Sequence, residues 1–220
     1  MAGVYGNKVV TDGLVYFIDT KNIVSYPGSG TTWTDLVGAK KGTLANGAGF
    51  TSGYMYFDGV DDEMNTGITI QPAAGSNLQS FCSWCYGTTG QFFGSNANGW
   101  GQFHLIVDWY YGYLRFGGSY YGGAGETTDL YSVTSNSSGW NYVSLVKTAA
   151  YYFDIYFNGQ LLASNVYRNS VYSSQLQLGT FWSYYHQPQY ISSLQIYNKS
   201  LSSSEVLLNY NSMKKKYGIV

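Results

Sequence analysis

The sequence predicts an all-β protein that ends in one α-helix. Three observations predict it: many short apolar runs separated by Gly- and Asn-rich turns, an Asn-Gly pair between two alternating runs, and a helical pattern near the C-terminal end. Short strands at regular spacing with turn signals are typical of a β-sandwich or barrel. A single all-β domain commonly reaches roughly 200–250 residues. We therefore predict one domain over residues 1–220, with a β core over 12–200.

Apolar and polar residues alternate in the predicted strand near the C-terminal end, where Leu194 and Ile196 point to one face and Ser193, Gln195 and Tyr197 to the other. The clearest hairpin surrounds Asn158-Gly159, because these residues accept the two positive φ angles of a type I′ turn. Its register predicts Ile155 opposite Leu162, and Tyr156 opposite Leu161. The predicted strands lie at residues 13–19, 53–58, 62–67, 79–87, 102–108, 112–117, 129–133, 140–147, 152–158, 161–166, 174–179 and 189–197.

The last predicted element is a helix over about residues 202–217. Ser202 and Glu205 have the spacing of a capping box, in which each side chain satisfies a free backbone N–H of the other. Lysines 214–216 fall in the last turn, where cations oppose the helix dipole, and Gly218 suits a left-handed helix end. An apolar face at helical spacing is formed by Val206, Tyr210, Met213 and Tyr217.

The composition is unusually poor in charge and rich in tyrosine. Charged residues make up 10% of the chain, whereas a typical soluble domain has roughly a quarter. The chain has 24 tyrosines and a formal net charge of −1. Proteins near zero net charge tend to associate, so the composition favours a component of an assembly. It disfavours nucleic acid as a partner, because no basic face is evident.

The chain start and the hydropathy pattern carry an expectation about location. The N-terminal residues lack a charged segment followed by an apolar core, so we expect no export signal. No apolar run approaches the roughly 18 residues that a membrane-spanning helix needs. We therefore expect synthesis in a cytoplasm without a signal peptide, and no membrane span.

Several motifs follow one another in the order of a known family. They occupy residues 13–19, 25–36, 42–47, 57–62, 140–143, 155–160 and 195–206. The chain resembles concanavalin A-like (laminin G-like) jelly-roll domains from about residue 12 to 218, in the version found in bacteriophage virion proteins and some secreted bacterial proteins. The resemblance implies a jelly-roll sandwich of two antiparallel sheets with one C-terminal α-helix.

The resemblance also carries a functional expectation. It implies a non-enzymatic phage virion surface protein. The favoured interpretation is a capsid decoration or accessory subunit, with glycan binding as an additional property. The expected partners are coat or fibre subunits, further copies of the chain and a host-surface glycan. The alternative is a carbohydrate-binding adhesin or receptor-binding module at a tail-fibre tip. A glycoside hydrolase comes third.

Cys82 and Cys85 form a C-x-x-C motif, which could serve a redox dithiol or half of a zinc site. The flanking residues predict a strand, where positions three apart point to opposite faces and cannot bridge. We therefore predict two structural, buried thiols.

The acidic residues do not predict catalysis. Retaining glycosidases need two positioned carboxyl groups, and the chain has three glutamates, Glu63, Glu126 and Glu205. Glu205 belongs to the capping box, and Glu63 follows a turn. His104 lies in an alternating run, and no Gly-x-Ser-x-Gly motif accompanies either histidine. The sequence predicts no catalytic residue.

Asp58, Asp61 and Asp62 are weak calcium candidates, since several laminin G-like relatives bind calcium at a sandwich edge. Calcium takes about six to eight oxygen ligands, so three aspartates in one turn do not make a site alone. Asp58 can instead stabilise the Asp58-Gly59 turn through the neighbouring backbone. The turn interpretation is favoured, and no cofactor is predicted.

Aromatic residues among Gly, Ser and Asn predict the contact surface. Rings in such a setting resemble a binding paratope and could stack on sugars. They could equally form a protein interface, where Tyr and Trp are enriched, and the weak charge favours this for at least half of them. The candidates are Trp100, Trp109, Tyr110, Tyr111, Tyr120, Tyr121, Trp182, Tyr184, Tyr185 and His186.

Overall fold

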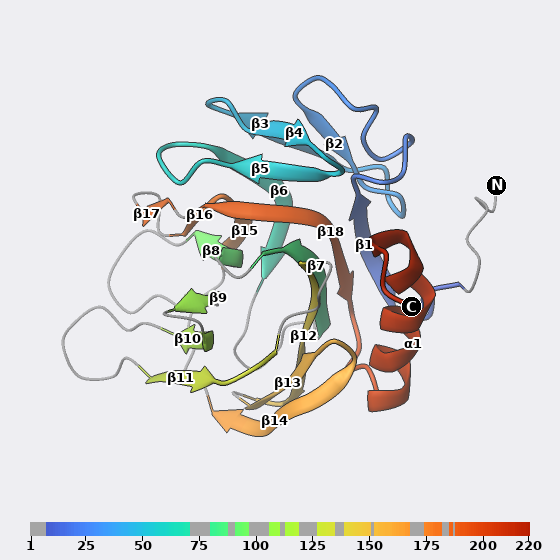
Figure 1. Ribbon diagram of the computed structural model, residues 1–220, viewed down its shortest axis with the longest axis vertical. Coiled ribbons are helices and arrows are strands. Elements are labelled where there is room, and N and C mark those ends of the chain that lie inside the picture. The colour runs from blue at the N-terminus through green and yellow to red at the C-terminus, as the bar shows by residue number, and fades with distance from the viewer. Residues whose placement is uncertain are drawn as a thin grey trace.

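The computed structural model describes residues 8–70, 80–87, 91–96, 106–110, 113–118, 127–134, 139–150, 152–167, 174–181, 185–186 and 188–220. These residues form two eight-stranded antiparallel sheets, a small two-stranded sheet and one helical segment at the C-terminal end (Figure 1). The prediction of a mostly β chain with antiparallel sheets and a C-terminal helix is confirmed.

The first sheet carries the C-terminal helix on its outer face. Its long central strand β18 (Gln189–Tyr197) pairs with β7 (Ser80–Tyr86) and β5 (Tyr54–Phe57), and β1 (Leu14–Asp19) also pairs with β18. In spatial order its strands are β14 (Gln160–Tyr167), β13 (Tyr152–Phe157), β12 (Trp140–Ala149), β7 (Ser80–Tyr86), β18 (Gln189–Tyr197), β5 (Tyr54–Phe57) and β4 (Gly49–Thr51).

The second sheet supplies the other wall of the core. In spatial order its strands are β11 (Thr127–Tyr131), β10 (Tyr113–Gly118), β9 (Ile106–Tyr110), β8 (Gln91–Asn96), β15 (Ser174–Leu178), β6 (Glu63–Ile70), β3 (Lys41–Ala45) and β2 (Thr32–Thr34). The small sheet pairs β16 (Thr180–Phe181) with β17 (Tyr185–His186).

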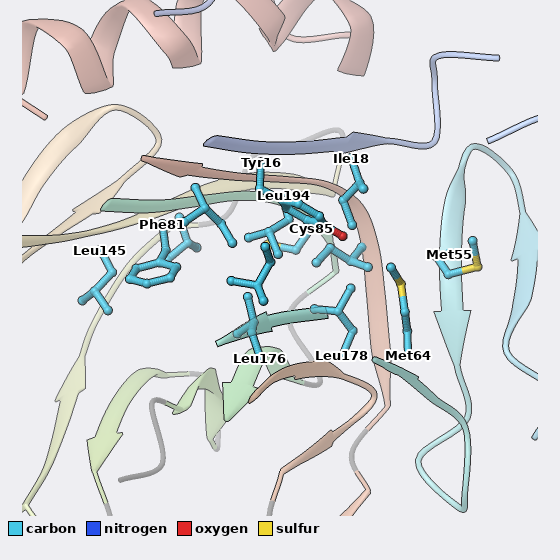
Figure 2. Close-up of a cluster of buried hydrophobic side chains, with 14 of the residues drawn as sticks. Tyr16, Ile18, Met55, Met64, Phe81, Cys85, Leu145, Leu176, Leu178 and Leu194 are labelled. Atoms are coloured by element: carbon cyan, nitrogen blue, oxygen red, sulfur yellow. The ribbon is translucent and has the colours of Figure 1, made fainter. Parts of the chain in front are cut away.

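Side chains from both large sheets meet in one apolar core (Figure 2). Leu145 and Leu194 point into it from the first sheet, and Leu176 and Leu178 from the second; all four are fully buried. Each buried leucine contributes about 1.5–3 kcal/mol by leaving water. The two sheets are therefore held together by alternating apolar residues, as the alternation in the sequence predicts.

The Asn158-Gly159 hairpin forms, but with one change of register. Both turn residues have positive φ, at 50° and 81°, and Tyr156 lies opposite Leu161 as predicted. Ile155 pairs with Ala163 rather than Leu162, because the register shifts between Ile155 and Tyr156. The predicted Ile155–Leu162 pair is therefore wrong. An extra residue in β14 makes a bulge, which sequence spacing does not reveal.

The two cysteines lie on opposite faces of β7, as predicted. Cys85 belongs to the core between the sheets, whereas Cys82 belongs to the apolar cluster beneath the helix. Both are free and fully buried. Burial raises the pKa of the Cys82 thiol to about 11 and also raises that of Cys85, so neither is a thiolate at neutral pH. The structural interpretation of this pair is confirmed.

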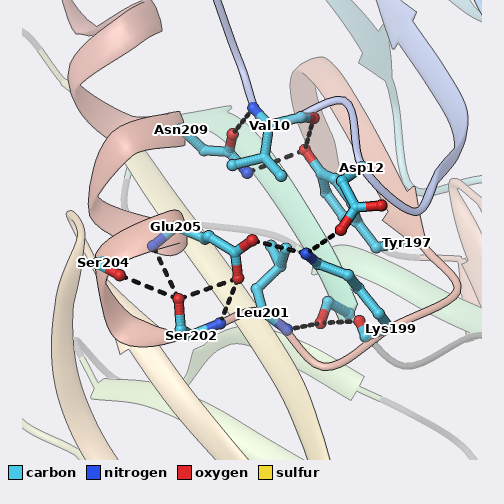
Figure 3. A network of polar contacts seen from close by, with 10 residues as sticks. Val10, Asp12, Tyr197, Lys199, Leu201, Ser202, Ser204, Glu205 and Asn209 are labelled. Atoms are coloured by element: carbon cyan, nitrogen blue, oxygen red, sulfur yellow. Dashed lines mark hydrogen bonds and ion pairs between the residues drawn. The ribbon is translucent and has the colours of Figure 1, made fainter.

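The C-terminal helix begins at the predicted cap (Figure 3). It comprises α1 (Ser203–Met213) and a 3₁₀ turn, η1 (Lys214–Tyr217), so the last predicted turn is tighter than an α-helix. The Ser202 backbone N–H donates to the Glu205 carboxylate (2.8 Å), and the Glu205 N–H donates to Oγ of Ser202 (3.3 Å). Gly218 ends the segment in the left-handed conformation, with φ 73°. The capping box and the glycine stop are confirmed.

The helix packs on aromatic side chains of the first sheet. Val206, Met213 and Tyr217 are buried, whereas Tyr210 is only partly buried. The Trp84 ring stacks on Tyr217, with centroids 4.1 Å apart and planes 17° apart. Such stacking adds to the energy of burying the rings. The helix thus buries part of the outer face of the first sheet in a second, smaller apolar core.

Polar contacts fix the helix to both ends of the chain. The amide of Asn209 links the Val10 N–H (2.8 Å) to the Tyr197 hydroxyl (2.9 Å), as Figure 3 shows. The Lys216 ammonium lies 2.9 Å from the fully buried Asp19 carboxylate. The contacts with Val10 and Asp19 join residues nearly 200 positions apart, so they tie the helical segment to the N-terminal part of the chain.

The strands β2, β3, β4, β8, β16 and β17 were not predicted. The first three are short and carry glycine or polar residues, so they lack a clear alternating pattern. β8 lies in a stretch rich in glycine and asparagine, which are residues typical of turns. Within the described residues, no helix is long and apolar enough to span a bilayer.

Candidate functional site

Four tyrosines share the outer face of the first sheet, next to the part that the helix covers. We call Tyr54, Tyr56, Tyr86 and Tyr190 the tyrosine face. They extend from three neighbouring strands, β7, β18 and β5. Strand alternation places them there, since Met55 and Phe57 between and beside them are fully buried in the core. All four tyrosines remain partly or largely exposed.

The rings of the tyrosine face contact one another in the spatial order Tyr86, Tyr54, Tyr190 and Tyr56. Tyr86 stacks on Tyr54, with centroids 5.3 Å apart and planes at 11°, and Tyr56 stacks on Tyr190 at 5.2 Å and 29°. Tyr54 joins the two pairs by an edge-to-face contact with Tyr190 at 5.6 Å. Trp140 lies beside Tyr86 and Tyr54, at 5.2 and 5.9 Å. The face is therefore one continuous aromatic row.

The surroundings of Tyr54 and Tyr56 keep both phenols protonated near neutral pH, because the pKa of each is raised. Burial is the first cause that raises the pKa of Tyr54, and the neighbouring tyrosines raise it further. The pKa of Tyr56 is raised as well, by desolvation, by Tyr190 and by the carboxylates of Asp58 and Asp62. These phenols keep their protons and can both donate and accept hydrogen bonds.

One end of the row borders the acidic turn at Asp58. The Val60 N–H donates to Oδ1 of Asp58 (2.7 Å), and the Asp58 N–H donates to Oδ2 of the buried Asp62 (2.9 Å). Gly59 has φ 82°, and a Cβ there would lie 2.6 Å from Cδ of Pro188. The turn therefore requires glycine, and the predicted role of Asp58 in an Asp-Gly turn is confirmed.

The three aspartates Asp58, Asp61 and Asp62 each offer an oxygen, and these oxygens lie within 4.8 Å of one another. Three such groups give half or less of the oxygens that calcium takes, about six to eight. Two of the carboxylates each accept a hydrogen bond from a turn N–H group. The calcium candidates thus lie together, as their spacing in the sequence predicts.

The pKa values of two of these carboxyl groups move apart. The Val60 N–H is the first cause that lowers the pKa of Asp58, whereas burial raises that of Asp62. The charge of His186 lowers both. Carboxyl groups with separated pKa values are a pattern of acid–base sites. Here the carboxyl groups of Asp58 and Asp62 are both hydrogen-bonded within their own turn, and Asp62 is buried.

Most of the predicted contact residues lie outside the part of the chain that the structure describes. The structure describes the backbone of Trp109 and Tyr110 in β9 and of Tyr185 in β17, but not their side chains. His186 in β17 is partly exposed and lies near the acidic turn. Those outside the described residues altogether are Trp100, Tyr111, Tyr120, Tyr121, Trp182 and Tyr184, as are the rejected catalytic candidates His104 and Glu126.

Sequence reasoning missed the tyrosine face. The signal was the alternation Tyr54-Met55-Tyr56-Phe57, in which two tyrosines occupy the face opposite two core residues. Tyr86 and Tyr190 extend it only because β7 and β18 are neighbours of β5, and strand order is not visible in the sequence.

Comparisons with known proteins show a shared fold. No family model matches the chain, and no curated protein matches its sequence. The structure is similar to Trypanosoma rangeli sialidase in complex with the inhibitor DANA, at 20% identity and a TM-score of 0.63, over 92% of this chain and 33% of the sialidase. It is also similar to the botulinum neurotoxin serotype D binding domain, at 13% identity and a TM-score of 0.62, over 91% of this chain and 52% of that one.

A third similar structure is of botulinum neurotoxin type C, whose cell entry depends upon interaction with two ganglioside molecules. It is 12% identical, with a TM-score of 0.61, over 91% of this chain and 51% of the toxin chain. This chain thus spans about a third of the sialidase and about half of the toxin chains. At such identities the likeness concerns the fold, and the neighbours agree that it is all-β.

Proposed function

We propose that this chain is a non-enzymatic virion surface protein, a capsid decoration or accessory subunit, whose concanavalin A-like jelly-roll domain also binds a glycan. One observation carries the glycan part. More than nine-tenths of the chain superposes on part of a sialidase that has been seen in complex with sialic acid, and on part of a neurotoxin whose cell entry depends upon interaction with two ganglioside molecules. The virion part rests on the resemblance of the sequence motifs and on the low charge.

The non-enzymatic part is supported by how the described carboxyl groups are used. Glu205 caps the helix and lies 2.6 Å from the Lys199 ammonium. Asp58 and Asp62 hold the turn that separates them. A retaining hydrolase needs two carboxyl groups free to face the substrate.

Two measurements on the purified chain test the proposal. The chain should be retained by at least one glycan of a surface-polysaccharide array, and it should release no reducing ends from that glycan. Release that Asp58→Asn, Asp62→Asn, Glu63→Gln or Glu126→Gln abolishes would make it a hydrolase. Absence of binding to every host glycan would remove the glycan part of the proposal.

The alternative, an adhesin at a fibre tip, is separated by competition on the particle. Soluble host polysaccharide should block an adhesin from the host surface but should leave a decoration subunit on its shell. Mass spectrometry of purified particles gives the copy number, which is high for a decoration subunit and low for a fibre tip. A chain absent from particles would contradict both virion roles.

A further inference from the structure

We propose that the tyrosine face is the glycan-binding surface, and that its ligand is a neutral polysaccharide lying across strands β7, β18 and β5. The inference rests on the proposed function and specifies its site and ligand class. The site differs from the contact surface that the sequence predicts, since none of its four tyrosines is among the predicted contact residues.

The first argument is the chemistry that the row presents. Each sugar ring has apolar C–H surfaces edged by hydroxyl groups, and each tyrosine has an apolar ring tipped by one hydroxyl. Among the described residues, none forms a hydrogen bond with the hydroxyls of Tyr54, Tyr56, Tyr86 or Tyr190. These hydroxyls are free to pair with sugar hydroxyls while the rings cover C–H groups. An apolar protein surface would leave them without partners.

The second argument is the rigidity of the row. Tyr86 is held between Tyr54 and Trp140, and a Cβ at Gly139 would lie 2.9 Å from Cε2 of Tyr86, so its ring fills the space beside that glycine. Tyr190 is held between Tyr54 and Tyr56. Rings fixed before binding lose little rotamer freedom when a ligand arrives, which lowers the cost of association.

The third argument is where the charges lie. No ionised side chain belongs to the row, and the charged groups that the described residues bring near it, Lys21, Asp58 and Asp62, lie at its ends. Lys21 lies over Trp140 at 5.2 Å and over Tyr217 at 4.9 Å, and it donates to the Lys216 carbonyl. Asp58 and Asp62 lie near Tyr56 at the other end. An anionic glycan would meet carboxylates there, so a neutral chain fits the row better.

The row is also continuous over several rings in three steps of 5.2–5.6 Å between centroids. A row of this form suits an extended chain of sugars, each contacting one or two rings, rather than one terminal sugar in a pocket. Affinity should therefore rise with oligosaccharide length until the row is filled.

Affinity electrophoresis tests the inference with a soluble β-glucan, a galactan, a mannan and a sialylated oligosaccharide as probes. The variant Tyr86→Ala/Tyr190→Ala should lose roughly tenfold or more in affinity, because exposed tyrosines are common hot spots. The matched control is Tyr152→Ala/Tyr167→Ala, which removes another exposed tyrosine pair, with centroids 5.4 Å apart, from the far end of the same sheet. The control should bind as the original chain does.

A second variant, Tyr86→Phe/Tyr190→Phe, keeps the rings and removes two hydroxyls, so it guards against misfolding of the alanine variant. It should bind more weakly than the original chain at unchanged melting temperature. Equal glycan binding by the original chain and both tyrosine-face variants would overturn this inference and leave the proposed function standing. Binding of no probe by the original chain would overturn this inference together with the glycan part of the proposed function, and would leave the virion part standing.

Two further outcomes would also contradict the inference. Selective binding of the sialylated probe would show that the ligand is anionic. A change from dimer to monomer in the Tyr86→Ala/Tyr190→Ala variant, seen by light scattering, would show that a second copy of the chain occupies the face.

Discussion

Two parts of one sheet face differ only in what covers them. Beneath the C-terminal helix, Trp84 and Tyr217 stack and are fully or almost fully buried. On the same outer face, Tyr86 stacks on Tyr54 with similar geometry, yet Tyr86 is 38% exposed. Trp140 contacts both groups and connects them. The same aromatic chemistry thus serves as core where a helix covers it and is left available for contacts where none does.

The largest expected effect separates the two parts by stability. Tyr217→Ala removes a large buried ring and should lower the free energy of unfolding by about 3–5 kcal/mol. Tyr86→Ala removes a partly exposed ring and should cost about 1 kcal/mol or less. Urea titration of both variants measures this. Similar losses for the two would show that the tyrosine face is as much a part of the core as the helix interface.

A smaller effect concerns the cap that holds the helix over its part of the sheet. The Lys199 ammonium lowers the pKa of Glu205 from 4.5, and the Ser202 N–H lowers it further. A carboxyl group whose pKa is lower in the folded chain than in the unfolded chain stabilises the fold at any pH above the unfolded-chain pKa. This stabilisation is lost as the pH falls from 4.5 through the pKa of the folded chain. Glu205→Gln should therefore flatten the dependence of melting temperature on pH below 4.5, with little change between pH 6 and 8.

Ser204→Ala is the control for the cap, since it alters the same turn and leaves the Glu205–Lys199 pair intact. It should keep the acid dependence of the original chain. An unchanged acid dependence in Glu205→Gln would show that the pair contributes nothing measurable.

The smallest expected effect lies at the acidic end of the tyrosine face. Because Asp58 and Asp62 accept turn N–H groups, neither added calcium nor a chelator should shift the melting temperature. Scanning calorimetry with each addition checks this. A rise with calcium that Asp61→Asn removes would show that the turn is a metal site and would extend the binding surface.

The sequence predicted most of the strands, the helix with its cap, and the opposite faces of Cys82 and Cys85, because each depends on local spacing. It did not predict the bulge opposite Ile155 or the short strands β2 to β4. The sequence did not predict the tyrosine face for a different reason. Its members belong to three strands whose neighbourhood is set by long-range pairing, and nothing in the local pattern distinguishes Tyr86, left exposed, from Trp84, covered by the helix.

The most direct test is a titration of the chain with a glycan that it binds, followed by NMR of isotope-labelled tyrosine rings. Single Tyr→Phe variants assign the resonances. The account predicts that the ring signals of Tyr54, Tyr86 and Tyr190 shift with the ligand, while those of Tyr152, Tyr167 and the buried Tyr217 stay in place. Shifts confined to other tyrosines, with the tyrosine face unchanged at saturation, would contradict it.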